Sequence, residues 1–211
     1  MRMWRDLVLV TVTPVLLAVV GVFHPHALTR ATAPEWAGLH IALLPVFPLV
    51  AVGFVVPLWA RPGRDVAGFA TVLAWVAGFG YATFYTGLDA VAGIAAGTAA
   101  MHAPSGDIGP AVLPLFAAGD ELGRVGAYAF LVAVLAASVA LFQRHGLRAL
   151  PGTLVLLLAG YSFIDSHIFW PRGVITMLGF ALGFGLFVWA AGRGHGSHPV
   201  SQGGAGPAVS D

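Results

Sequence analysis

The sequence predicts an all-α integral membrane protein, a bundle of six transmembrane helices with both chain ends in the cytoplasm. Hydrophobic residues make up 58% of the 211 residues, charged residues only 9%, and the mean hydropathy is +0.87. Soluble domains carry about 25% charged residues, so this composition indicates a membrane protein. Six long apolar segments and an uneven distribution of arginines complete the prediction.

Each apolar segment is long enough to cross a hydrocarbon core of about 30 Å, which needs roughly 20 helical residues. The predicted spans, in chain order, are 6–23, 38–60, 66–92, 125–142, 151–170 and 173–191. A signal peptide is the alternative for the first, but its apolar stretch is longer than usual and no small-residue cleavage site follows directly. We therefore expect an uncleaved first helix.

Two intervals have special features. Pro45, Pro48 and Pro57 fall in the second span and predict a kink or local unwinding there, because each proline removes a backbone donor. The polar interval 99–124 is expected to be a loop that contains at most a short interfacial helix.

The arginines predict the orientation. Three flank the ends of spans on one side (Arg30, Arg124 and Arg172), and seven fall on the other side, at the N-terminus, in two short loops and at the start of the tail (Arg2, Arg5, Arg61, Arg64, Arg144, Arg148 and Arg193). Positive residues concentrate in cytoplasmic loops, so both ends are expected there.

Residues 1–191 are thus expected to form the transmembrane domain, and the Gly-, Ser- and Pro-rich tail 192–211 to be disordered in the cytoplasm. All ten basic residues are arginine, and Ala, Gly and Val are abundant. This usage indicates a GC-rich genome and hence a bacterial inner membrane.

Several classes of function are excluded by composition. The formal net charge is +1, and no basic run with interleaved aromatics could follow a nucleic-acid backbone. The absence of cysteine excludes thiolate ligands, so a metal site must use nitrogen and oxygen. The chain also lacks P-loop, Rossmann, HExxH and GxSxG motifs.

Two pairs of glycines predict close helix contacts. Gly93 and Gly97, and likewise Gly179 and Gly183, are four residues apart and share a helix face on which another backbone can approach closely. Besides the lipid bilayer, the partners that these faces suggest are other membrane subunits or a second copy of the chain.

Histidines gather at the extracytoplasmic ends of the predicted helices. In the HPH stretch the proline favours an extended backbone, so that His24 and His26 point the same way. Neutral imidazole is the commonest metal ligand, and a nitrogen and oxygen set suits copper, zinc or iron. The predicted metal ligands are His24, His26, His40, Asp89 and His167. A haem held by His40 and His167 is a less favoured cofactor. The possibility that the chain binds no cofactor stays open.

Two helices present a tyrosine one turn from a carboxylate. Tyr81, Tyr85 and Asp89 follow at intervals of four, as do Tyr161 and Asp165. A carboxylate inside a span is costly and usually faces the bundle interior or water. Asp165, Asp89 and Tyr85 are therefore the candidate catalytic residues.

The sequence thus predicts a metal- or haem-binding membrane protein of the oxidoreductase or hydrolase class, with enzymatic activity left open. A proton-coupled transporter, in which Asp165 and Asp89 titrate and the proline-broken span gates access, is one alternative. A membrane subunit or scaffold without metal or activity is the other.

Overall fold

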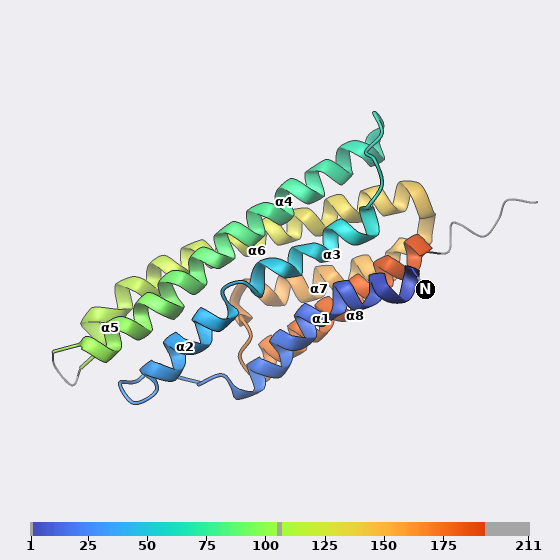
Figure 1. Cartoon of the computed structure of the whole chain (residues 1–211). Coiled ribbons are helices and arrows are strands. Elements are labelled where there is room, and N and C mark those ends of the chain that lie inside the picture. Colours follow the sequence, from blue (N-terminus) through green and yellow to red (C-terminus); the bar gives the residue numbers. More distant parts are fainter. Residues whose placement is uncertain (1, 105–106, 193–211) are drawn as a thin grey trace, which may run out of the picture.

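A computed structural model describes residues 2–104 and 107–192, and every regular element within them is helical. The long helices run side by side along one axis (Figure 1). The elements are, in order, α1 (Arg2–Phe23), α2 (Ala33–Leu43), η1 (Phe47–Ala51), α3 (Val52–Val55), η2 (Val56–Leu58), α4 (Val66–Leu88), the π-helix η3 (Asp89–Ala95), α5 (Ala96–His102), α6 (Gly109–His145), η4 (Gly146–Ala149), α7 (Leu150–Ser166) and α8 (Arg172–Gly192). The predicted tail lies outside the described residues except for Gly192.

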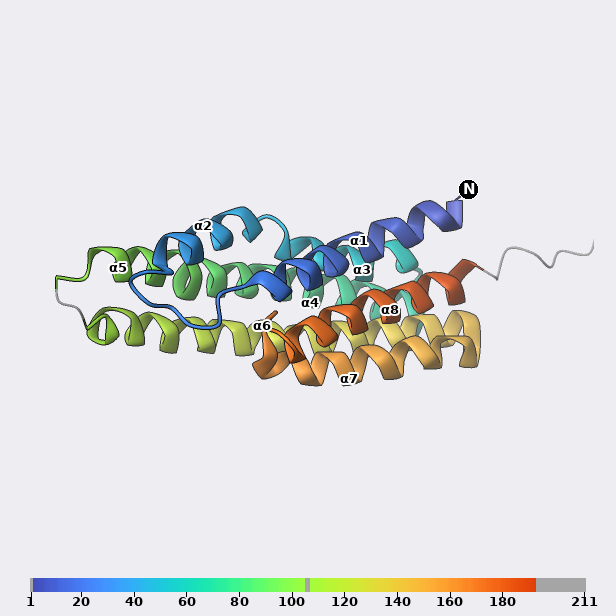
Figure 2. The ribbon, with the colours of Figure 1, turned by 90° about the horizontal axis from the view of Figure 1, so that it is seen from below.

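Five helical stretches of the described chain are long and apolar enough to cross a membrane: Met3–Phe23, Ala33–Leu58, Val66–His102, Gly109–Ser166 and Arg172–Gly192. The fourth contains both α6 and α7, which are joined by a turn where Gly146 has a φ of +62°. Figure 2 shows α7 running back along α6. The prediction of an all-helical membrane fold is confirmed. The count of six transmembrane spans and the cytoplasmic location of both chain ends stay predictions.

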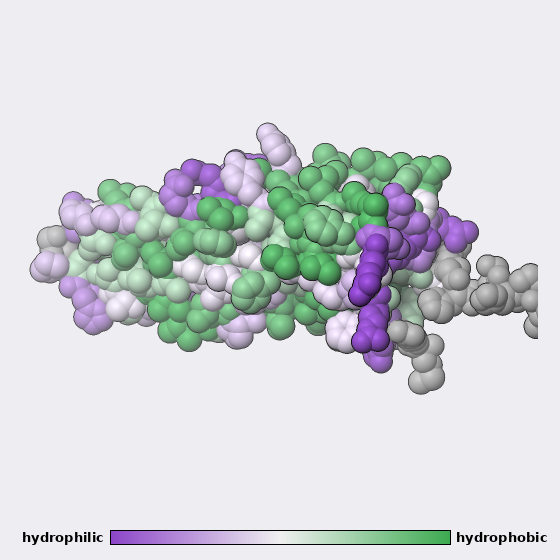
Figure 3. Space-filling model, turned by 90° about the horizontal axis from the view of Figure 1, so that it is seen from above, coloured by the Kyte–Doolittle hydropathy of each residue, from purple (hydrophilic) through white to green (hydrophobic). Residues whose placement is uncertain are grey.

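Apolar side chains cover much of the surface of the bundle. Hydrophobic residues dominate the middle of the face in Figure 3, and hydrophilic residues lie toward both ends. Phe69, Phe79 and Leu158 are each more than 70% exposed. Apolar surface of this extent is unfavourable in water, and it fits contact with lipid chains.

The helical hairpin of α4, η3, α5 and α6 is longer than a bilayer core. Each arm, Val66–His102 and Gly109–His145, has 37 residues, which corresponds to about 55 Å at 1.5 Å per residue. The hydrocarbon core is only about 30 Å thick. The hairpin therefore extends past the ends of α1, α7 and α8, and α2 lies along this extension beside α5 (Figures 1 and 2).

The expected loop at 99–124 is wrong for residues 99–102, which belong to α5, and for residues 109–124, which belong to α6. A row of glycines explains the difference, because it lets α6 pack closely against the opposite arm. Gly119 faces Ala92, Gly123 faces Leu88, and Gly126 faces Tyr85. A Cβ at Gly119 would lie only 2.5 Å from that of Ala92. Tertiary packing thus extends a helix that the polar composition alone would have ended.

The second apolar stretch is broken, as its prolines predict. Pro48 is the second residue of η1 and Pro57 the second of η2, and the stretch from Phe47 to Leu58 alternates between 3-10 and α-helical turns. A neighbouring helix satisfies a carbonyl at this break, because the Tyr81 hydroxyl donates to the Phe47 carbonyl oxygen at 3.1 Å. Broken helices are tolerated within membranes when protein groups supply such bonds.

The glycine pairs make helix contacts within the chain, as predicted. A Cβ at Gly97 would lie 2.9 Å from that of Ala37 on α2, and one at Gly179 would lie 2.9 Å from that of Ala159 on α7. Gly93 lies directly against the His40 ring, and Gly183 against the Leu156 side chain. Both faces are therefore covered by α2 and α7, and an oligomer through them stays a prediction.

Phe130 of α6 is at the centre of the main core, and its replacement by alanine is expected to destabilise the protein by about 3–5 kcal/mol. The side chain is fully buried and its ring centroid lies 4.3 Å from that of Phe180 and 5.1 Å from that of Phe54. Thermal unfolding in detergent measures the loss. Phe79→Ala, at a side chain that is 73% exposed, is the control, and equal unfolding temperatures of the two variants would contradict this account of the core.

Candidate metal centre

Three histidines from distant parts of the chain meet where the hairpin extends past the other helices. His24 follows the last residue of α1, His40 lies in the last turn of α2, and His167 follows the last residue of α7. One ring nitrogen from each lies within 4.8 Å of the other two. His24 and His40 are only 2% exposed. The described residues therefore include a group of three histidines that could bind a metal ion.

The hydrogen bonds of the rings leave a second nitrogen free on each. Nδ1 of His24 donates to the Pro25 carbonyl oxygen at 2.8 Å, and Nδ1 of His40 donates to the Trp36 carbonyl oxygen at 2.7 Å. Because carbonyls only accept, these two Nε2 atoms carry lone pairs. His24 Nε2 is buried and has no hydrogen-bond partner within the described residues.

The third imidazole is oriented by a tyrosine. His167 Nδ1 and the Tyr85 hydroxyl are 2.8 Å apart, and when Nδ1 donates to the hydroxyl oxygen, Nε2 becomes the ligand atom. Metal-binding histidines generally use one nitrogen for the ion and donate with the other. All three rings fit this pattern.

Burial keeps the imidazoles of His24 and His167 neutral. The pKa of His24 is lowered to about 4: burial is the main cause, the bond to Pro25 opposes it, and the neighbouring His40 and His26 add to the lowering. Burial also lowers the pKa of His167 well below its usual value, with His40 and His24 adding to the effect. Neutral imidazole is the form that binds a metal.

Aromatic rings surround the cluster and separate it from solvent. Trp36 stacks on His40 with 5.2 Å between ring centroids, Phe169 meets His24 edge-on at 4.5 Å, and Phe47 stacks on His167 at 5.3 Å. The Trp36 indole also donates to the Ala92 carbonyl oxygen at 3.1 Å, which ties α2 to η3. These wall residues carry no metal-ligand chemistry, so no sequence motif identifies them.

The backbone at His167 is unusual. Its φ is +43°, a region that L-residues with side chains rarely adopt. The following residues are packed tightly, because Gly21 of α1 lies against the Ile168 carbonyl oxygen and Gly173 of α8 lies against the backbone of residues 167 and 168. Strained conformations of this kind persist where the surrounding structure enforces them, often at functional sites.

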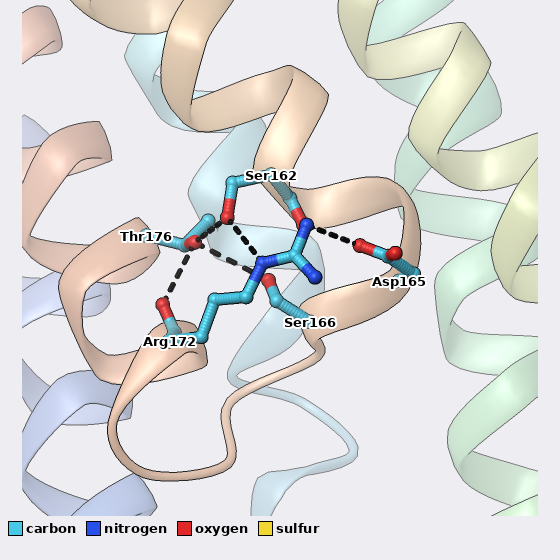
Figure 4. A network of polar contacts seen from close by, with 5 residues as sticks. All are labelled: Ser162, Asp165, Ser166, Arg172 and Thr176. Atoms are coloured by element: carbon cyan, nitrogen blue, oxygen red, sulfur yellow. Dashed lines mark hydrogen bonds and ion pairs between the residues drawn. The ribbon is translucent and has the colours of Figure 1, made fainter.

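A polar network joins the two helices on either side of this loop (Figure 4). An Arg172 guanidinium nitrogen lies 2.6 Å from an Asp165 carboxylate oxygen, and its Nε donates to the Ser162 hydroxyl at 3.3 Å. The Thr176 hydroxyl bonds to Ser162 and Ser166. The network fixes the end of α7 relative to the start of α8 and so positions the loop that carries His167.

The other predicted site residues are divided between the cluster and the surface. Asp165 has a side chain that is 65% exposed and pairs with Arg172, outside the histidine cluster. His26 is exposed and is not part of the cluster, although it is only two residues from His24. Tyr85 contacts His167, and Asp89 is fully buried one turn away from Tyr85. His102, expected in solvent, is exposed.

The Tyr85→Phe substitution is expected to weaken metal binding by about 10- to 100-fold, the usual cost of losing a group that orients a ligand. It removes the hydrogen bond between the Tyr85 hydroxyl and Nδ1 of His167. Chelator competition on the detergent-purified protein measures the affinity. Tyr161→Phe, at a tyrosine that is 72% exposed, is the control; if both variants bind like the parent protein, Tyr85 does not orient His167.

No family model, no curated protein and no solved structure matches this chain. The geometry of the cluster is therefore the basis for assigning a function.

Proposed function

We propose that the protein is a membrane metalloprotein that binds one copper, zinc or iron ion through His24, His40 and His167. The observation that supports the proposal is the convergence of three imidazole nitrogens within 4.8 Å, together with the hydrogen bonds that engage the Nδ1 atom of every ring. A nitrogen-only set of this kind suits zinc, copper and iron.

Binding requires a small contraction of the cluster. Metal–nitrogen bonds of about 2.0–2.1 Å place tetrahedral ligand atoms about 3.4 Å apart. A pair of nitrogens at the 4.8 Å limit thus has to approach by about 1.4 Å on binding, which rotations of the three side chains can supply. Close ring packing favours an ion over a haem, because His24 lies 5.2 Å from His40 and 6.2 Å from His167 between centroids, and a porphyrin plane needs far more room.

Three protein nitrogens leave a coordination position open on the ion. A catalytic metal keeps such a position for water or substrate, where it acts as a Lewis acid or exchanges electrons. This arrangement favours an oxidoreductase or hydrolase over a scaffold. The exposed position of Asp165 gives little support to a carrier that moves protons through that residue.

The proposal includes the membrane topology. Splitting the stretch Gly109–Ser166 at Gly146 gives six passes, with α6 and α7 as separate spans. Both chain ends then lie on one side, in agreement with Met3 and Gly192 being neighbours. The arginine distribution favours the cytoplasm for that side, so the ion site belongs to the extracytoplasmic end of the bundle.

Metal loading of the detergent-purified protein tests the proposal. The protein is incubated separately with Zn²⁺, Cu²⁺ and Fe²⁺, desalted, and analysed for metal content. We expect one ion per chain, and an electron paramagnetic resonance spectrum of the Cu²⁺ form that shows couplings to imidazole nitrogens. Failure to retain any of the three ions, or a copper spectrum without nitrogen couplings, would overturn it.

A further inference from the structure

We propose that Asp89 is the fourth ligand of this site and that its charge makes the site one for a dication. This inference rests on the proposed function above. It adds an anionic oxygen donor to three neutral nitrogens, and so names the class of ion that binds. Water or substrate would then occupy a fifth position, because a catalytic zinc can expand from four to five ligands.

The position of Asp89 places it beside the three imidazoles. Tyr85, four residues before it, contacts His167, and Gly93, four residues after it, lies against the His40 ring. Residues at this spacing share one face of a helix. Asp89 therefore lies on the face that receives both histidines, between their two points of contact.

The burial of Asp89 is the second observation. Its side chain is fully buried, and neither carboxylate oxygen has a hydrogen-bond partner within residues 2–104 and 107–192. A buried carboxylate without a partner is very unfavourable, and inside a membrane protein such groups usually serve function. A bound cation would supply the missing partner.

The helix is also irregular at this residue. Asp89 begins the seven-residue π-helix η3, which ends at Ala95. Single π-turns within α-helices are rare and occur frequently at functional sites. The wider turn changes the register of the helix between Tyr85 and Gly93, and both of these residues contact ligands of the proposed site.

The donor set selects the ion by charge and softness. Three imidazoles and a carboxylate suit borderline dications such as Zn²⁺, Cu²⁺ and Fe²⁺, whereas Cu⁺ prefers soft sulfur ligands and gains less from a carboxylate. The Asp89 carboxylate oxygens are not among the atoms grouped within 4.8 Å. The Asp89 side chain therefore has to rotate toward the imidazoles when the ion binds.

The Asp89→Asn substitution tests the inference, because it keeps the size of the side chain and removes its charge. We expect at least a tenfold weaker affinity for Zn²⁺, since even groups that only orient ligands cost about 10- to 100-fold, and a smaller loss for Cu⁺. Asp120→Asn is the matched control, since that carboxylate is exposed on α6 and lies outside the network around His167; its Zn²⁺ affinity is expected to equal that of the parent protein. Both affinities are measured by chelator competition.

The outcomes separate the two proposals. If the unsubstituted protein binds no ion, the proposed function fails. If it binds one ion and Asp89→Asn binds Zn²⁺ equally well, only the role of Asp89 is overturned.

A measurement on the unsubstituted side chain covers the case in which Asp89→Asn does not fold. The unsubstituted protein is produced with ¹³C-labelled aspartate, loaded with Cu²⁺ and studied by electron–nuclear double resonance. A coupling between copper and a carboxyl ¹³C nucleus is expected from an aspartate ligand. A spectrum with imidazole couplings and no carboxyl coupling would overturn the inference.

Discussion

Alanine in place of any one of His24, His40 and His167 is expected to abolish stoichiometric retention of the metal ion. Each substitution removes a direct ligand and leaves only two imidazoles of the cluster. Groups that merely orient a ligand cost about 10- to 100-fold in affinity, so loss of a ligand is expected to cost at least about 100-fold. Metal content after loading and desalting measures the effect.

Two other histidines provide matched controls for this prediction. His26 and His102 are exposed, and alanine at either position is expected to leave one ion per chain. The unfolding temperature of each variant is compared with and without ion, because an ion that binds only the folded state stabilises it. A cluster variant that still gains stability from the ion, or a His26→Ala protein that loses the ion, would contradict the site.

A Gly93→Ala substitution is expected to lower metal affinity by about as much as removing His40, although it changes no ligand. A Cβ at this position would overlap the Cγ, Cδ2 and Cβ atoms of His40. The π-helix cannot retreat, because Ala92 beside it already lies against Gly119 of α6. The imidazole therefore has to leave its position in the cluster.

Gly38→Ala is the control for the change at Gly93. Gly38 lies on α2, two residues before His40, and a Cβ there would meet no atom within 4 Å. Chelator competition should show parent-like affinity for this variant and a loss of at least about 100-fold for Gly93→Ala. Equal affinities of the two proteins would show that the contact between Gly93 and His40 does not position the ligand.

Much of the fold could be predicted from the sequence because lipid imposes simple constraints. Long apolar segments predicted the membrane helices, the prolines predicted the break between Phe47 and Leu58, and the glycine spacings predicted close contacts at Gly93 and Gly97. The extent of α6 could not be read from polarity, since it depends on packing. The spacing of Gly119, Gly123 and Gly126 contained that information.

The sequence predicted the residue types of the site well, but it predicted less well which histidines belong to the cluster. His24, His40 and His167 were among the predicted ligands and converge, whereas His26 shares the HPH motif and faces outward. An extended backbone through HPH would have pointed both rings the same way. Instead, His24 Nδ1 donates to the Pro25 carbonyl oxygen, and the His26 ring lies outside the cluster. The cost of a carboxylate inside a span predicts that Asp165 faces the interior, but α7 ends at Ser166, and Arg172 reaches the carboxylate from the next helix.

The ligands of the proposed site lie far apart along the chain, so synthesis from the N-terminus would deliver them to the membrane at different times. His24 and His40 belong to the first two apolar stretches, whereas His167 follows α7, near the end of the bundle. A nascent chain that has not yet inserted α7 has only two of the three imidazoles. Ion capture would thus mark completion of the bundle, and chains that stall or lose their last two helices would stay metal-free.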